Sequence, residues 1–251
     1  MTVAAHAIYV YAVLRAGTAL PEGAGGVGSP PEAVRVIRQG LLGAVVSDAP
    51  PHLRARRRDL LAHQELLLRL SDEGPVLPMR FGMVAPDEET VLKQLAAAEG
   101  GHVATLDQLA GRIEINVKAL PAQDALPALV AEDQNVRRLR EAARRHPGYE
   151  ESLRLGEAIA SALARRAAAA GQRLLRELAP EARAVAPGPE VPGCALNMSF
   201  LVDHSDANAF LARAQSFADA HREQVELRLA GPLPCYSFVT AEARPVPVGG
   251  G

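Results

Sequence analysis

The sequence predicts an α+β fold in two domains. Three observations support this prediction: the length of 251 residues, several short apolar runs typical of strands, and a long helix-forming region in the second half. Domains commonly contain about 100 to 200 residues, so the length favours two of them. We place the boundary just before Gly111, which gives an N-terminal α+β domain at 1–110, a C-terminal domain at 111–245 and a flexible tail at 246–251.

The first elements of the N-terminal domain are strands. Residues 7–14 are rich in β-branched and aromatic side chains, which suits a buried strand. A Gly- and Pro-rich loop follows, and the apolar runs at 34–37 and 41–47 then predict a hairpin that turns at Gly40. An amphipathic pattern predicts a helix over 54–70.

The segment at 74–81 (GPVLPMRF) does not fit a regular central strand. Pro75 and Pro78 have no N–H group to donate to a neighbouring strand. A proline followed by three acidic residues then marks a helix start. We expect this helix over 87–98 and a shorter one over 103–109.

The C-terminal domain opens with a strand and continues with long helices. Apolar residues alternate with polar ones over 112–118, so they lie on one face of a strand. Helix-forming sequence covers 126–145 and, after a break, 149–178. The second of these helices would be ~45 Å long, a length that suits contact with a partner.

The remaining elements predict the topology of this domain. A Pro- and Gly-rich linker at 180–193 precedes a strand at 195–202, and Ser205 or Asp206 caps the next helix. A last strand covers 225–230. Strand, helices, strand, helix, strand is the order of a ferredoxin-like unit. The sequence therefore predicts a modified ferredoxin-like domain with a long helical extension.

Composition excludes several classes of protein. The 27 basic and 29 acidic residues give a net charge of -2, whereas nucleic-acid-binding domains usually carry a strong basic excess. No apolar run approaches the ~18 residues that a membrane span needs. The two cysteines, Cys194 and Cys235, fit a reducing compartment. We therefore expect no nucleic-acid partner, no membrane span and a cytoplasmic location.

Catalytic and cofactor motifs lack their structural context. The glycines at 23–28 match G-x-G-x-x-G, but a dinucleotide site needs them between a strand and a helix. A hairpin follows here, so we interpret the segment as a flexible loop. The seven histidines show no metal-ligand spacing. The residues of a triad are present at 203–206, but consecutive residues cannot orient one another as a triad requires. We expect no catalytic residue, metal or cofactor.

Three segments together resemble the gas vesicle protein F/L family. The first is His63 followed by residues 74–82 (GPVLPMRFG), the second is 111–118 (GRIEINVK), and the third is 197–202 (NMSFLV) with the closing residues 231–238 (GPLPCYSF). The resemblance extends over nearly the whole chain in the right order. Cys235 departs from it, because the family usually carries a second proline there.

The resemblance implies a two-domain fold with a modified ferredoxin-like second domain. It also implies a non-enzymatic accessory or minor structural protein of gas vesicles, located in the vesicle and the cytoplasm. Its implied partners are the hydrophobic shell subunit and other gas vesicle accessory proteins. The alternative is a ferredoxin-like small-ligand-binding module or an enzyme, which would need a deep pocket with convergent polar groups.

The candidate residues are the signature positions of these segments. Each either contacts a partner or shapes the turns of the scaffold, and the chemistry of Gly and Pro favours the scaffold. On the scaffold interpretation Arg80 pairs with an acid such as Glu114. The candidates are His63, Pro78, Arg80, Phe81, Gly82, Glu114, Lys118, Gly231, Pro232, Tyr236 and Phe238.

Overall fold

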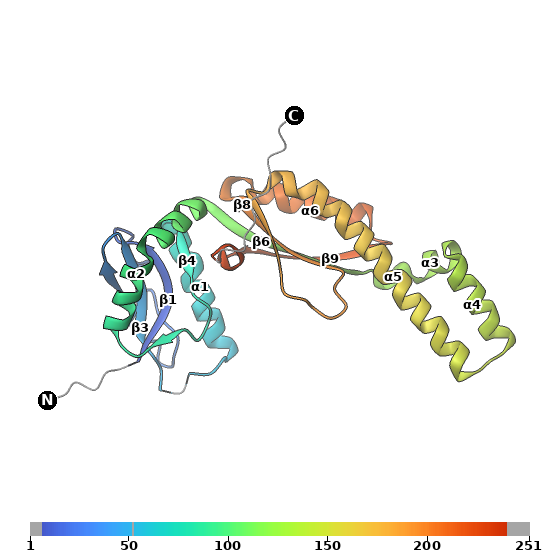
Figure 1. Cartoon of the computed structure of the whole chain (residues 1–251), viewed down its shortest axis with the longest axis horizontal. Coiled ribbons are helices and arrows are strands. Elements are labelled where there is room, and N and C mark those ends of the chain that lie inside the picture. The colour runs from blue at the N-terminus through green and yellow to red at the C-terminus, as the bar shows by residue number, and fades with distance from the viewer. Residues whose placement is uncertain (1–6, 52, 240–251) are drawn as a thin grey trace. The chain divides into compact units, whose positions relative to one another are not determined.

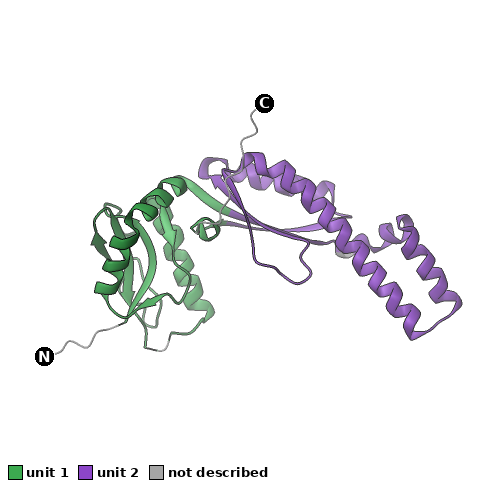
Figure 2. Cartoon of the chain, in the orientation of Figure 1, with its two compact units in different colours: residues 1–114, 232–243 green, residues 115–231, 244–251 purple. Residues whose placement is uncertain are grey.

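The computed structural model describes residues 7–51 and 53–239 (Figure 1). They form two compact units (Figure 2): the first extends to Glu114 and includes the closing residues from Pro232, and the second runs from Ile115 to Gly231. The expected tail at 246–251 lies outside the described residues. The domain bounds 1–110 and 111–245 stay a prediction, because packing alone does not show which segment folds independently.

An antiparallel sheet forms the centre of the first unit. Its order is β2-β3-β1-β4, and the short β5 also pairs with β1. The hairpin expected around Gly40 is present, with Gly40 at a φ of 57°. The strands are β1 (Ile8–Arg15), β2 (Arg35–Gln39), β3 (Leu42–Asp48), β4 (Val76–Pro78) and β5 (Val84–Ala85). As expected from its prolines, the segment that contains β4 takes an edge position rather than a central one.

Two helices pack on this sheet. Helix α1 (Arg57–Glu73) contributes Leu66, Leu67 and Leu70 to the core around Tyr9 and Tyr11 of β1. Because β1 is buried from Ile8 to Leu14, both faces of the sheet are covered at its centre.

The second helix corrects the sequence-based expectation of two short helices over 87–98 and 103–109. Helix α2 (Glu88–Leu109) is continuous through Gly100 and Gly101 and contacts β1, β2, β3 and β4. Two glycines cost about 1 kcal/mol each in a helix. Buried side chains before and after them offset that cost: Val91, Leu95, Leu106 and Leu109.

The second unit contains the expected ferredoxin-like arrangement. Its sheet has the order β7-β8-β6-β9, so the strands taken along the chain are arranged 2-3-1-4. The strands are β6 (Arg112–Pro121), β7 (Ala184–Pro187), β8 (Leu196–Asp203) and β9 (Val225–Leu233). Strand β7 falls inside the segment expected to be a linker. It is an edge strand paired antiparallel with β8, a position that tolerates the proline at its end.

The helices of this unit differ from expectation at one point. The region at 126–145 forms two helices, α3 (Leu126–Glu132) and α4 (Gln134–Arg145), separated by Asp133. The Asp133 carboxylate accepts the N–H groups of Asn135 and Val136 at 2.9 and 3.0 Å and caps α4. Helix α5 (Tyr149–Leu178) has the expected bounds.

The last helix of this unit is α6 (Ala207–Ala220). Asp206 is its N-cap residue but makes no side-chain capping bond, because a 3₁₀ turn precedes the helix. Among the helices that the structure describes, none is long and apolar enough to cross a membrane.

Candidate functional site

A buried hydrogen-bond network holds the first signature segment, residues 74–82. His63 of α1 is 2% exposed, and its Nε2 lies 2.9 Å from the carbonyl oxygen of Met79. A carbonyl only accepts, so Nε2 carries the proton, and Nδ1 accepts from the Tyr9 hydroxyl at 3.0 Å. The Tyr9 hydroxyl in turn accepts the N–H of Gly82 at 3.1 Å. Burial lowers the pKa of His63, which favours this neutral ring.

Aromatic packing adds to the network. The Phe81 ring meets Tyr9 and His63 edge-on, with centroids 6.0 and 5.8 Å apart, and Tyr11 stacks on His63 at 5.6 Å. Pro78 is buried in β4. The structure thus brings His63 and Phe81 together on the inner side of the segment, where hydrogen bonds and ring contacts hold its backbone against β1 and α1, and Pro78 pairs with Ala12 of β1.

The glycine-rich segment at 23–28 is anchored in this core, which corrects its interpretation as a flexible loop. Val27 is fully buried, and its N–H donates to the Tyr11 hydroxyl at 2.8 Å. The N–H of Gly28 donates to the carboxylate of Asp59 at 3.2 Å. A Cβ at Gly26 would lie 2.3 Å from the Tyr11 hydroxyl oxygen. Gly26 therefore permits the backbone to approach Tyr11 closely. The segment leads to strand β2 and does not form the strand-to-helix turn that a phosphate-binding site needs.

The outer side of the first signature segment is exposed. Met83 is 48% exposed and Val84 42%, and Arg80 and Gly82 are also exposed. Gly82 has a φ of 87°, a conformation that favours glycine. The expected pair between Arg80 and Glu114 does not form: Arg80 is exposed, whereas the Glu114 carboxylate is buried and accepts hydrogen bonds from Ser237.

The closing signature folds back onto the first unit. Glu114 is buried, and its two carboxylate oxygens accept the N–H and the hydroxyl of Ser237 at 2.8 and 2.7 Å. Tyr236 packs against the core that contains Tyr9, and Phe238 is buried. Burial raises the pKa of the Cys235 thiol and of the Tyr236 hydroxyl to about 12 each. These residues act together as a structural latch, defined here as residues 235–238 with Glu114.

Three candidate residues lie apart from both networks. Lys118 of β6 is half-buried and lines a cavity of about 170 Å³ in the second unit, together with Asn116, Cys194 and Arg228. Gly231 and Pro232 are exposed and belong to β9, so they do not shape a turn. Pro232 is tolerated there because β9 is an edge strand.

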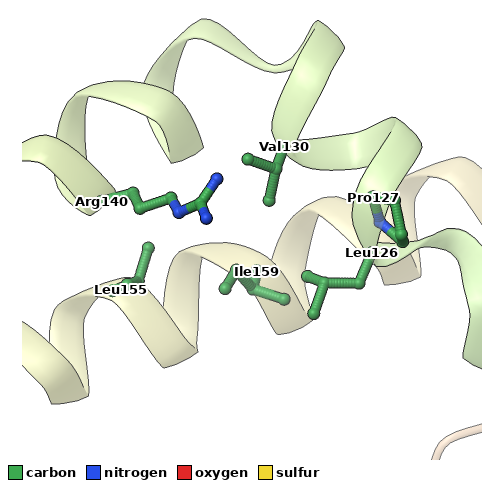
Figure 3. A pocket seen from close by; sticks show the side chains of 6 residues that line it. All are labelled: Leu126, Pro127, Val130, Arg140, Leu155 and Ile159. Atoms are coloured by element: carbon green, nitrogen blue, oxygen red, sulfur yellow. The ribbon is translucent and has the colours of Figure 1, made fainter.

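A further surface, a groove between helices, was not predicted from the sequence. It has a volume of about 480 Å³ and lies between α3, α4 and α5 (Figure 3). The signal that could have located it is the spacing of apolar residues four apart on two neighbouring helices. The groove is lined by Leu126, Pro127, Val130, Arg140, Leu155 and Ile159. Within the described residues, no group of three His, Cys, Asp or Glu side chains is placed to hold a metal ion.

Comparison with known proteins yields one consistent family. The profile of the family described as "Gas vesicle synthesis protein GvpL/GvpF" matches residues 7–240. Gas vesicle protein F of a Streptomyces species is 43% identical over 235 residues, which cover 92% of this chain and 98% of that protein. Gas vesicle protein F of a Nostoc species is 28% identical over 190 residues, which cover 73% and 78%.

Solved structures show the same fold. The crystal structure of GvpF from an Anabaena species aligns with a TM-score of 0.74 at 24% identity and covers 94% of this chain and 98% of its own. GvpF from Microcystis aeruginosa aligns with a TM-score of 0.71 at 20% identity and covers 93% and 99%. The mixed helix-and-sheet fold expected from the sequence is thereby confirmed.

Proposed function

The chain belongs to the GvpL/GvpF family of gas vesicle synthesis proteins, and from this membership we propose that it binds the hydrophobic shell subunit and supports vesicle assembly without catalysis. A shell that holds gas needs subunits with a large apolar surface, and such surfaces aggregate when they are left exposed. An accessory protein that covers this surface during growth would prevent aggregation. Other gas vesicle accessory proteins are further proposed partners, in the vesicle and in the cytoplasm.

The observation that supports this proposal best is the contrast between the two sides of residues 79–84. On the inner side the Tyr9 hydroxyl accepts the N–H of Gly82, and the Nε2–H of His63 donates to the carbonyl oxygen of Met79. The outer side presents Met83 and Val84 to solvent at 48% and 42% exposure. An apolar surface that is already ordered loses little conformational entropy on binding. We propose that this outer side, together with Arg80, contacts the shell subunit.

Co-expression with the shell subunit in cells that assemble vesicles tests the proposal. The double variant Arg80→Glu, Met83→Asp changes the outer side only, and we expect it to recover severalfold less shell subunit in a pull-down. Leu41→Asp is the matched control, because Leu41 is 58% exposed in the β2–β3 hairpin. If the unaltered chain does not associate with the shell subunit, the proposed function is wrong. If the double variant recovers as much shell subunit as the unaltered chain, only the proposed contact surface is wrong.

A further inference from the structure

The groove of the second unit has a simple construction. The first part of α5 and the two helices before it form what we call the helical tip, residues 126–163. Beneath the groove, Leu129, Val136 and Ala162 form a small buried core. Figure 3 shows Leu126 and Val130 on one wall, opposite Leu155 and Ile159 on the other.

The apolar residues of the groove remain accessible. Leu126 is 43% exposed, and Val130, Leu155 and Ile159 are only partly buried. Each wall carries its two apolar side chains four residues apart, which places them in a row along the helix. Two apolar rows on facing helices, with a channel between them, can hold the apolar stripe of one added helix, the helix-in-groove mode of recognition.

The charge of the groove specifies the chemistry of that helix. Helix α4 carries five arginines against the single acid Glu141. Figure 3 shows the Arg140 side chain extending into the groove between Val130 and Leu155. In the part of the chain that the structure describes, no carboxylate pairs with Arg140. One side of an otherwise apolar channel is therefore positively charged.

We propose that the groove binds an amphipathic helix of a partner protein, with its apolar stripe in the channel and carboxylates along the edge that faces Arg140. A second copy of the chain that docked through the same groove would bring two arginine-rich helices together, and like charges at an interface are repulsive. An anionic bilayer would attract the arginines, but the apolar side chains face one another across the channel rather than outward from one plane. The proposal is independent of the shell contact proposed above, because it concerns another surface.

Site-specific crosslinking in vesicle-producing cells tests the occupant. A photoreactive phenylalanine analogue replaces Leu126 in the full-length chain, and mass spectrometry identifies the crosslinked segment. We expect a segment with apolar residues at helical spacing and acidic residues along one edge. The same analogue at Ala160, an exposed position of α5 outside the groove lining, is the control and should not capture it. Crosslinks to lipid, to another copy of this chain or to nothing would overturn the proposal.

Charge reversal then tests how the captured segment binds. As a synthetic peptide it should bind Arg140→Glu about fivefold more weakly than the unaltered chain, and a peptide with lysines in place of its acids should reverse that preference. Arg176→Glu is the control, because Arg176 lies near the end of α5, outside the helical tip. Equal affinity of both peptides for both chains would overturn the proposal. The shell pull-down, which depends on Arg80 and Met83, can succeed or fail separately.

Discussion

His63 joins three segments of the first unit through its two ring nitrogens. Its Nε2–H donates to Met79 of the first signature segment, and Nδ1 accepts from Tyr9 of β1. A protonated ring would have no acceptor left for the Tyr9 hydroxyl proton. The neutral form is therefore part of the folded structure, and protonation should oppose folding.

A pH dependence of stability follows from this histidine. Burial holds the pKa of His63 below its ordinary value of 6.5, so below that pH the unfolded chain binds a proton that the folded chain does not. The free energy of unfolding that neutral His63 contributes is fully present above pH 6.5. It is lost as the pH falls toward the pKa of the folded state, by up to about 1.4 kcal/mol per pH unit. Urea unfolding at about pH 7.5 and about pH 5.5 measures the loss.

The variant His63→Gln isolates this contribution. Its amide can donate to Met79 and accept from Tyr9, but it does not titrate. All other titratable groups are the same in the two proteins, so any difference between their losses of unfolding free energy on acidification comes from residue 63. We expect the unaltered chain to lose more free energy of unfolding than the variant on acidification. Equal losses would contradict the assignment of the neutral ring.

The two cysteines should differ in reactivity. Cys235 is 6% exposed, and burial raises the pKa of its thiol to about 12, whereas Cys194 is only half-buried. The thiolate is the reactive form. We expect iodoacetamide to label Cys194 of the folded chain at least about tenfold faster than Cys235, as measured by mass spectrometry of the two peptides. Urea should remove the difference, and a Cys235 that reacts equally fast before unfolding would contradict the burial of the latch.

At the scale of elements, the elements whose ends have local sequence signals were predicted correctly, whereas those that depend on packing against distant residues were not. The bounds of α5 and the β2–β3 hairpin follow from signals within a few residues, such as the break at 146–148 and the turn at Gly40. The continuity of α2 through Gly100 does not, because the buried residues that support it make contacts distant in sequence. Strand β7 was missed for the same reason. Its four residues carry no strong strand pattern, and β8 supplies the hydrogen bonds.

Helix α4 depends on its cap. Asp133 accepts two N–H groups at the start of this helix, and the helix is too short and too densely charged to persist in isolation. Asp133→Ala should therefore cost about 1 kcal/mol, seen as faster hydrogen exchange in α4. Asp133→Ser keeps a capping oxygen, so hydrogen exchange in α4 of this variant should be nearly as slow as in the unaltered chain. Equal exchange in all three would show that contacts with α5 alone hold α4.

At the scale of the whole chain, both units use one sheet order. In each, the strands taken along the chain are arranged 2-3-1-4. The second unit has helices between its first two strands, whereas the first unit has the Gly- and Pro-rich loop there. The local patterns of the sequence predicted the second arrangement. They did not predict that residues 232–239 complete the first unit, because the partner of Ser237 is Glu114, 123 positions away.

This long-range closure leads to a prediction about truncation. A chain that ends at Gly231 loses the Phe238 and Tyr236 packing and leaves the buried Glu114 carboxylate without Ser237. Loss of one large buried side chain and of the partner of a buried polar group should together cost about 3 kcal/mol or more. The matched reference is a chain that ends at Val239, since it keeps each of these contacts. Hydrogen exchange in β1 and β3 should be faster in the shorter chain, while α5 and β8 of the second unit should exchange alike in both. Equal protection of β1 in the two truncated chains would show that the latch does not stabilise the first unit, and that the closing signature is present for contact with a partner instead.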